Sequence, residues 1–393
     1  MRCTGVSARG IRLPVLTKRS DDLVRIVCDE LERASRSSRD PFEFRDGDVV
    51  GVTESLLARS QGNFVTLDDI TEDVERLVPA GDIALAFPLL SRNRFGQILL
   101  ALSRGVRGRL HILLSYPADE VGNRLIEPSN FYRQSVKLKG DLFSEREYDE
   151  VFGRYPHPFT GVDYVSYYKG MNPEKIEIHF ANNPLSALRF SRTIVVAGIH
   201  ARSLHREILE RAGATVFTLE QFCASPRTDG TGYNEEYGLL GANFSSEESL
   251  KLFPRDSASF ARALSDELYT RTGRRVEALV YGDGAFKDPA AGIWELADPV
   301  VSPGFTEGLR GLPKEIKFKY VADNAGDRSP DEAVREAILH KDDMDLSAKT
   351  ALGTTPRRLT DLLGSLCDLV SGSGDKGTPV VYISGYFDSY LDE

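Results

Sequence analysis

The sequence has little cysteine, and its cysteines follow no binding pattern. Four of them, Cys3, Cys28, Cys223 and Cys367, are spread over 393 residues. They form neither a Cys-x-x-Cys pair nor the spacing of a zinc site, and they are too few for a small disulfide scaffold. We expect reduced thiols with a structural role.

Long apolar runs and an excess of basic charge are also missing. No uninterrupted apolar stretch approaches the roughly 18 residues that a membrane-spanning helix needs, and MRCTGVSARGIRLP at the amino terminus lacks the apolar core of a signal peptide. The 49 Lys and Arg residues face 59 Asp and Glu residues, a formal net charge of -10, which disfavours bulk binding of nucleic acid. The sequence therefore predicts a cytoplasmic protein with no membrane and no nucleic-acid partner.

Several familiar catalytic motifs are absent as well. We find no Walker A sequence, no G-x-S-x-G elbow and no G-x-G-x-x-G after a strand, so P-loop, hydrolase and standard dinucleotide interpretations lose their usual support. A dehydrogenase built on TIVVAGIHARSLHREIL would have only Gly198 at its strand-to-helix turn. The six histidines are scattered, and only His200 and His205 come near one another.

What is present is typical of a globular enzyme with more than one domain. Hydrophobic residues make up 41% and charged residues 27% of the chain, and its length predicts two domains or one domain with a large insert. Residues 193–217 read as strand, helix and strand, with Gly213 ending the helix, which is typical of a βαβ unit on a parallel sheet. We expect residues 111–234 to form an inserted, Rossmann-like α/β subdomain.

Two strands end in polar residues that could meet a ligand. Val49 to Val52 is a β-branched run with Thr53 at its polar end, and residues 54–59 follow as a helical turn that Gly62 closes. Ligands often lie at such strand-to-turn junctions.

Val276 to Tyr281 is a second apolar strand, and it runs into Gly282-Asp283-Gly284. Two glycines around an acid let a phosphate-bound Mg²⁺ or Mn²⁺ approach, and Glu295 lies close enough in sequence to assist. An ordinary Asp-Gly turn fits the same pattern.

The carboxyl-terminal region contains a glycine-rich loop. An amphipathic helix from Leu359 to Leu369 precedes the loop at 371–377, which includes Gly374 and Lys376, and the strand PVVYI follows. Such a loop can cradle phosphates, but the order of helix and strand is the reverse of a P-loop, and a flexible linker is the alternative.

Polar and aromatic segments also occur at the edges of the expected insert. Asn123, Tyr164 and Asn234 belong to such segments, and loops of this kind often form binding walls. Ordinary turns would have the same composition.

Three segments, taken in order, resemble the γ-glutamyl ligases that add glutamate to the deazaflavin coenzyme F-420. GDVVGVTESLLARSQG resembles the family's GDVLVVTSKIVSKAEG, with Thr53, Arg59 and Gly62 matching in kind. Residues 241–283 resemble the segment in which an Asn precedes LLPxD and a later strand ends in a metal-binding acid, and Asn243 and Asp283 occupy those positions. LTDLLGSLCDLVSGSGDKGTPVVYISGY resembles the family's DELAxAAELVMGKxxGxPVxxVRG.

The resemblance implies a ligase that uses GTP or ATP and Mg²⁺ or Mn²⁺ to join L-glutamate to a small-molecule carboxylate. Asp283 would bind the metal and Glu295 would be a second ligand. Thr53, Glu54, Arg59, Gly62, Gly374 and Lys376 would bind the nucleotide, and Asn123, Tyr164, Asn234 and Asn243 the acceptor. The resemblance also implies a homodimer with a mixed α/β fold and interwoven β-structure.

The predicted organisation is a ligase core in two parts, 1–110 and 235–393, around the insert at 111–234. This sequence departs from the family where Glu54 and Ser55 replace a serine and a lysine. A different acceptor, such as a folate, or a noncatalytic nucleotide-binding protein on the same fold therefore remain as alternatives.

Overall fold

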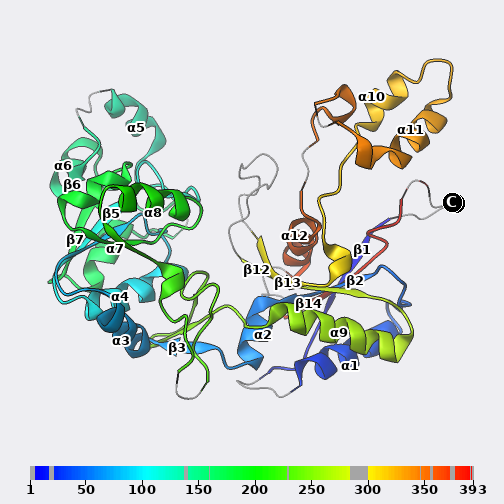
Figure 1. The fold of residues 1–393 in the computed structure, drawn as a ribbon, viewed down its shortest axis with the longest axis horizontal. Coiled ribbons are helices and arrows are strands. Elements are labelled where there is room, and N and C mark those ends of the chain that lie inside the picture. The colour runs from blue at the N-terminus through cyan, green and yellow to red at the C-terminus, as the bar shows by residue number, and fades with distance from the viewer. Residues whose placement is uncertain are drawn as a thin grey trace. The chain divides into compact units, whose positions relative to one another are not determined.

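The computed structural model of the protein describes residues 5–16, 22–136, 140–158, 160–227, 230–283, 300–345, 347–354, 357–371, 377–389 and 391. The chain divides into two compact units, each drawn as helices and strands in Figure 1. Unit 1 consists of residues 1–60 and 256–393, and unit 2 consists of residues 61–255. Both units contain helices and strands, so the predicted mixed α/β class is confirmed.

Unit 1 contains a five-stranded sheet. Its strands, in order across the sheet, are β1 (Ser7–Ile11), β14 (Val380–Ser384), β2 (Val49–Thr53), β12 (Glu277–Asp283) and β13 (Val300–Phe305). Strands β2 and β12 run parallel, and the other neighbours are antiparallel. The apolar runs that predicted strands at 49–52, 276–281 and PVVYI are all found in this sheet.

Helices cover both faces of this sheet. Figure 1 shows α1 (Leu23–Ser35) and α9 (Ser257–Thr272) on one side and α12 (Leu359–Ser371) on the other. Successive residues of a strand point to opposite faces, so Val50 and Val52 pack toward α1 and α9, whereas Val49 packs toward α12.

Helix α12 approaches β2 closely at one glycine. A Cβ atom on Gly51 would lie 2.4 Å from the Sγ atom of Cys367, which is a buried free thiol. Glycine at this position therefore sets the distance between the helix and the sheet.

Helix α1 begins after Asp22. This residue is the N-cap, and its side chain accepts a hydrogen bond from the Arg25 amide. The other α-helices of unit 1 in the described ranges are α2 (Glu54–Ser60), α10 (Phe318–Asp323) and α11 (Pro330–Leu339).

Unit 2 contains a six-stranded sheet in which all strands except β6 are parallel. Its strands, in order, are β6 (Phe143–Ser144), β7 (Ile176–Phe180), β5 (Leu110–Leu114), β4 (Ile83–Ala86), β8 (Thr193–Val196) and β9 (Thr215–Thr218). Helix α8 (Arg202–Arg211) joins β8 to β9, so the predicted strand, helix and parallel strand are confirmed.

The remaining elements of unit 2 complete its core. Its other α-helices are α3 (Leu67–Leu77), α4 (Gln97–Gly105), α5 (Pro128–Ser135), α6 (Glu145–Phe152) and α7 (Tyr164–Met171). A small antiparallel sheet contains β10 (Asn243–Ser246), β11 (Ser249–Lys251) and β3 (Phe64–Thr66). No helix in the described ranges combines the length and apolarity that crossing a bilayer requires.

The unit boundaries differ from the predicted ones at 110/111 and 234/235. Strand β4, which was assigned to the first part of the core, lies in the middle of the parallel sheet of unit 2, between β5 and β8. Its four residues are all buried. A short apolar run cannot show from sequence alone which sheet it will join, because its partners are distant in the chain.

Candidate active site

The carboxyl ends of β2 and β12 lie side by side in unit 1. Because the two strands are parallel and Thr53 pairs with Tyr281, the residues that follow, Glu54 and Gly282, reach the same edge of the sheet. Ligands of α/β proteins commonly bind outside the carboxyl ends of parallel strands.

Strand β2 passes directly into helix α2 at this edge. The Thr53 Oγ1 atom accepts a hydrogen bond from the Leu56 amide at 3.3 Å, as an N-cap residue does. Glu54 begins the helix and is only 2% exposed, and its carboxylate accepts a hydrogen bond from the Ser55 hydroxyl at 3.1 Å. Buried carboxylates are stabilised by hydrogen bonds or by a bound cation, which makes Glu54 a candidate functional residue at this strand end.

Gly282 brings the Glu54 side chain against the end of β12. A Cβ atom at this position would lie 2.0 Å from Glu54 Cγ, so any other residue would displace that side chain. The backbone of Asp283 pairs with Val300 on β13, while its side chain and Glu295 lie outside the described parts. Carboxylate oxygens are the ligands that Mg²⁺ and Mn²⁺ prefer. The buried carboxylate of Glu54 and the backbone of the predicted metal acid, Asp283, lie at the same strand end.

The residues that flank the glycine-rich segment 372–376 adjoin the same edge. The Thr53 amide donates a hydrogen bond to the carbonyl of Pro379 at 2.9 Å. On the other flank, Ser371 lies beside the Tyr281 hydroxyl, and burial raises the pKa of that tyrosine. The residues on both sides of segment 372–376 therefore lie next to the paired residues Thr53 and Tyr281.

The other predicted nucleotide ligands are distributed differently. Gly374 and Lys376 lie outside the described residues. Arg59 is exposed, and its Nε atom donates a hydrogen bond to the Leu16 carbonyl at 2.9 Å; six residues of helix separate it from Thr53 by about 9 Å along the axis. Gly62 has a φ of 62° and closes the turn after α2, as predicted, and it belongs to unit 2.

Two of the predicted acceptor residues lie near residues 90–93 of unit 2, close to the end of β4. Asn123 donates a hydrogen bond from its side-chain amide to Asp119 at 2.9 Å, and the same carboxylate accepts one from the Leu90 amide at 2.9 Å. Asn243 accepts a hydrogen bond from the side chain of Asn93 at 3.2 Å.

A third acceptor residue, Tyr164, lies beside Arg92 in the same segment. Burial raises the pKa of the Tyr164 hydroxyl, and the nearby Arg92 guanidinium partly offsets this effect. Three of the four predicted acceptor residues therefore adjoin residues 90–93. This segment includes the exposed Arg92, which the sequence analysis did not select.

The fourth, Asn234, has an architectural role. It is 4% exposed, and its amide nitrogen donates to the carbonyls of Phe253 and Pro254. Its side-chain oxygen accepts hydrogen bonds from the amides of Glu236 and Tyr237. Both polar atoms hold the main chain, so the residue type that suggested ligand binding is explained by a loop that it stabilises.

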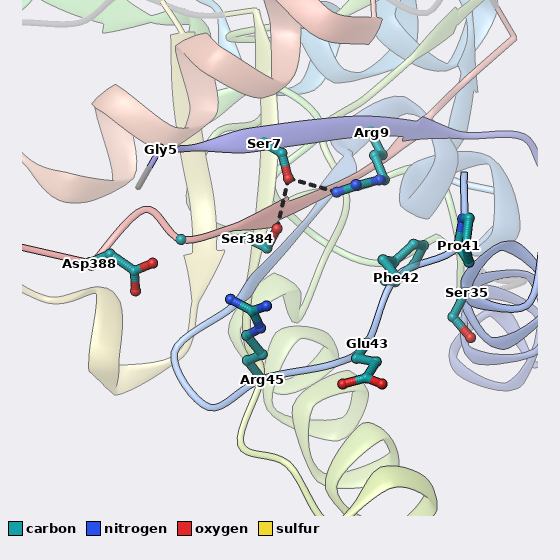
Figure 2. A pocket seen from close by; sticks show the side chains of 11 residues that line it. Gly5, Ser7, Arg9, Ser35, Pro41, Phe42, Glu43, Arg45, Ser384 and Asp388 are labelled. Atoms are coloured by element: carbon teal, nitrogen blue, oxygen red, sulfur yellow. Dashed lines mark hydrogen bonds between the residues drawn. The ribbon is translucent and has the colours of Figure 1, made fainter. Parts of the chain in front are cut away.

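A cavity of about 650 Å³ lies at the other end of the unit 1 sheet (Figure 2). Figure 2 shows the Ser7 and Ser384 hydroxyls bonded to each other at 2.8 Å, with Arg9 bonded to Ser7 at 2.7 Å. Arg9 also forms an ion pair with Asp40 at 2.9 Å. None of the predicted site residues lines this cavity, so it is separate from the strand ends described above.

A comparison with protein-family models matches residues 10–385 to the family described as F420-0:Gamma-glutamyl ligase. This chain belongs to that family. Membership supports a γ-glutamyl ligase function, as the resemblance implied. The matched range includes residues 111–234, for which the motifs had suggested no counterpart. A search of curated proteins found no significant match.

One acid of the ligase motif was missed by sequence reasoning. Asp361 is 8% exposed, and burial raises its pKa to about 6; its Oδ2 atom has no hydrogen-bond partner among the described residues. The carbonyl of the preceding residue, Thr360, accepts a hydrogen bond from the Ser302 hydroxyl at 3.2 Å. Ser302 follows Val301 on β13, and Val301 pairs with Gly282. The match of Asp361 to the first residue of DELA was the available signal.

Proposed function

We propose that this member of the family joins L-glutamate to a small-molecule carboxylate in a reaction that consumes GTP or ATP. The observation that carries the proposal is the strand end at which the buried Glu54 packs against Gly282, one residue before Asp283. A cation held by carboxylates at this strand end would suit a reaction in which negative charge accumulates on a transferred phosphoryl group.

Asp283 and Glu54 would hold a Mg²⁺ or Mn²⁺ ion, with Glu295 as a further ligand. Such a cation neutralises charge on nucleotide phosphates. Glu54 replaces a serine of the family motif, so this chain would contribute one more carboxylate to the ion than the motif provides.

Thr53, Lys376 and the main chain around the glycine-rich segment would bind the phosphates. The chain is acidic overall, so its phosphate site requires local donors and cations. The flanks of 372–376 adjoin Thr53 and Tyr281, which supports a shared site for the two segments. Arg59, at the far end of α2, would contact a more distant part of the nucleotide.

The chemistry proceeds in two balanced steps. The acceptor carboxylate attacks the terminal phosphoryl group, which gives an acyl phosphate and a nucleoside diphosphate. The amine of glutamate then attacks the acyl carbon, so an amide forms, inorganic phosphate leaves and one proton is released. Exclusion of water from the site during the reaction would protect the acyl phosphate from hydrolysis.

The acceptor is proposed to be of the F-420 type, and a folate is the alternative within this class. Segment 90–93 includes the exposed Arg92 and adjoins Asn123, Tyr164 and Asn243. Such a surface suits an anionic acceptor through charge-assisted hydrogen bonds. A homodimer is also expected, and light scattering of the purified protein would test it.

Release of inorganic phosphate tests the function directly. The assay contains GTP or ATP, Mg²⁺ or Mn²⁺, glutamate and either F-420-0 or a folate, and mass spectrometry identifies the product. We expect phosphate release to require both glutamate and F-420-0, with a mass increase of one glutamyl residue. Phosphate release with glutamate and a folate, but not with glutamate and F-420-0, would favour the alternative acceptor. Nucleotide binding without phosphate release under any of these conditions would indicate a noncatalytic protein.

A further inference from the structure

Two imidazoles and a carboxylate converge on one face of the unit 2 sheet. Glu177 and His179 are two residues apart on β7 and therefore point to the same face. His111 on β5 pairs with Glu177 across the parallel ladder, so all three side chains meet above adjacent strands. The alternate residues Ile176 and Ile178 point to the opposite, apolar face.

The three nearest atoms have the separations of metal ligands. His111 Nδ1 lies 3.2 Å from His179 Nε2 and 3.2 Å from the Glu177 Oε2 atom, and the last two atoms are 4.0 Å apart. An ion equally distant from three atoms so placed would lie about 2 Å from each, which is the length of zinc–nitrogen and zinc–oxygen bonds. Without an ion, a single N–H at His111 Nδ1 can point at only one of its two neighbours, His179 Nε2 or Glu177 Oε2.

The surrounding residues hold these ligands in place. Phe190 stacks on both imidazoles, with ring centroids 4.9 Å from His111 and 3.9 Å from His179. Arg109 contacts the other carboxylate oxygen of Glu177, which leaves Oε2 directed at the imidazoles.

Asp82 supplies an outer carboxylate. Its Oδ2 atom lies 3.9 Å from His111 Nε2, on the side of the ring away from the three converging atoms. Its Oδ1 atom accepts a hydrogen bond from the Arg109 amide at 2.8 Å, so the carboxylate is fixed by the main chain. A carboxylate behind a ligating histidine orients the ring and increases its basicity.

Solvent access also suits a metal ion at this place. A cavity of about 650 Å³ is lined by Glu177 and His179, and water in it could complete the coordination.

We propose that unit 2 binds one divalent ion of the zinc class through His111 Nδ1, Glu177 Oε2 and His179 Nε2. Two imidazoles with one carboxylate select such an ion over Mg²⁺, which prefers oxygen ligands alone. The site is independent of the ligase proposal, because its residues share no element with the strand ends of unit 1.

Titration of the metal-free, full-length protein with Zn²⁺ tests the site. We expect one Zn²⁺ per chain, bound in the presence of excess Mg²⁺, and a rise in melting temperature. His179→Ala and the more conservative Glu177→Gln should each weaken binding at least about 10-fold. Equal zinc affinity in wild type and both variants, or displacement of Zn²⁺ by equimolar Mg²⁺, would overturn the assignment.

Two controls separate this site from other binding. His340→Ala removes an exposed histidine at the end of α11 and should leave the titration unchanged, as should Asp283→Asn, which removes the acid proposed for the ligase metal. Co²⁺ provides a readout on the wild type alone, because replacement of its water ligands by imidazole nitrogen shifts and intensifies its visible bands. A Co²⁺ spectrum that matches the aqueous ion would contradict the proposal even if a variant failed to fold.

Discussion

The sheets of the two units place their polar side chains in different positions. In unit 1, residues 278–281 of β12 and 49–52 of β2 are buried, and polar groups gather where these strands end. In unit 2, His111, Glu177 and His179 lie within β5 and β7, among buried neighbours. The first arrangement can admit a ligand at the end of the sheet, and the second would hold an ion over the face of neighbouring strands.

This difference decides which chemistry suits each sheet. A strand end that is followed by glycine can admit a large, charged substrate together with its metal ion. Side chains fixed on neighbouring strands can hold a small ion with constant geometry but have little room for a nucleotide. The phosphoryl-transfer chemistry of the proposed ligase is therefore assigned to unit 1 and the proposed zinc-class ion to unit 2, and variants in both units can test this division.

Asp283→Asn should have the largest effect. Loss of the proposed metal carboxylate should lower the rate of ligation about 10³-fold or more, because metal stabilisation of phosphoryl transfer is worth several kcal/mol. Circular dichroism should show an intact fold. Asp266→Asn, an exposed acid on α9 in the same unit, is the matched control and should be fully active. Near wild-type turnover of Asp283→Asn at saturating Mg²⁺ would remove the ligase chemistry from this strand end.

A pair of glycine substitutions should separate function from packing. Gly282→Ala would push the Glu54 side chain away from its position 2.0 Å from the new Cβ, and Gly51→Ala would meet Cys367 at 2.4 Å. Both changes overpack unit 1 and should cost about 1–3 kcal/mol of stability. Only Gly282→Ala should also reduce turnover, by about 10-fold or more. Equal turnover in the two variants at a temperature where both are folded would show that the position of Glu54 is unimportant.

Asp361→Asn should change stability in a pH-dependent way. Burial raises the pKa of Asp361 from 3.8 to about 6, so the folded state holds this proton more tightly than the unfolded state. The ionised carboxylate therefore destabilises the fold above pH 6, by up to about 3 kcal/mol, and this cost disappears as the pH falls from 6 toward 4.

Urea unfolding at pH 7.5 and pH 4 measures this difference. The asparagine variant should be the more stable protein at pH 7.5 and should have no advantage at pH 4. An advantage of the same size at both pH values would show that folding does not raise the pKa of Asp361, and that the gain has another cause. If ligation falls while stability rises, the buried charge is retained for function.

Arg92→Ala should have the smallest effect. It should raise the KM for the acceptor several-fold and leave nucleotide affinity unchanged, as expected when a contact remote from the reacting phosphate is lost. Steady-state kinetics with each substrate varied in turn would measure this. Arg146→Ala, an exposed arginine of α6, serves as the control. Weaker nucleotide binding with an unchanged acceptor KM would assign the 90–93 segment to the nucleotide instead.

The strand ends of unit 1 could be predicted because local sequence determines them. The β-branched run before Thr53 and the apolar run before Gly282 predicted β2 and β12, and the resemblance singled out Asp283. The close contact between Glu54 and Gly282 could not be foreseen, since it depends on the parallel pairing of strands more than 200 residues apart in sequence.

The unit boundaries and the histidine cluster were hidden for a related reason. IALA at 83–86 is too short for its sheet to be identified from its own pattern. IEIHF alternates as any half-buried strand does, so His179 and Glu177 looked like ordinary outward residues until β5 brought His111 beside them. The structural role of Asn234 could not be separated from ligand binding in the sequence, because asparagine is common both in binding loops and in turns.

Hydrogen exchange with and without a nonhydrolysable GTP or ATP analogue and Mg²⁺ tests whether the ends of β2 and β12 form one nucleotide site with the glycine-rich segment. The account predicts that nucleotide slows exchange in residues 53–60 and 371–379 together, because both segments adjoin the paired ends of β2 and β12, with little change in β5 and β7. Protection of only one of the two segments, or protection confined to unit 2, would contradict it.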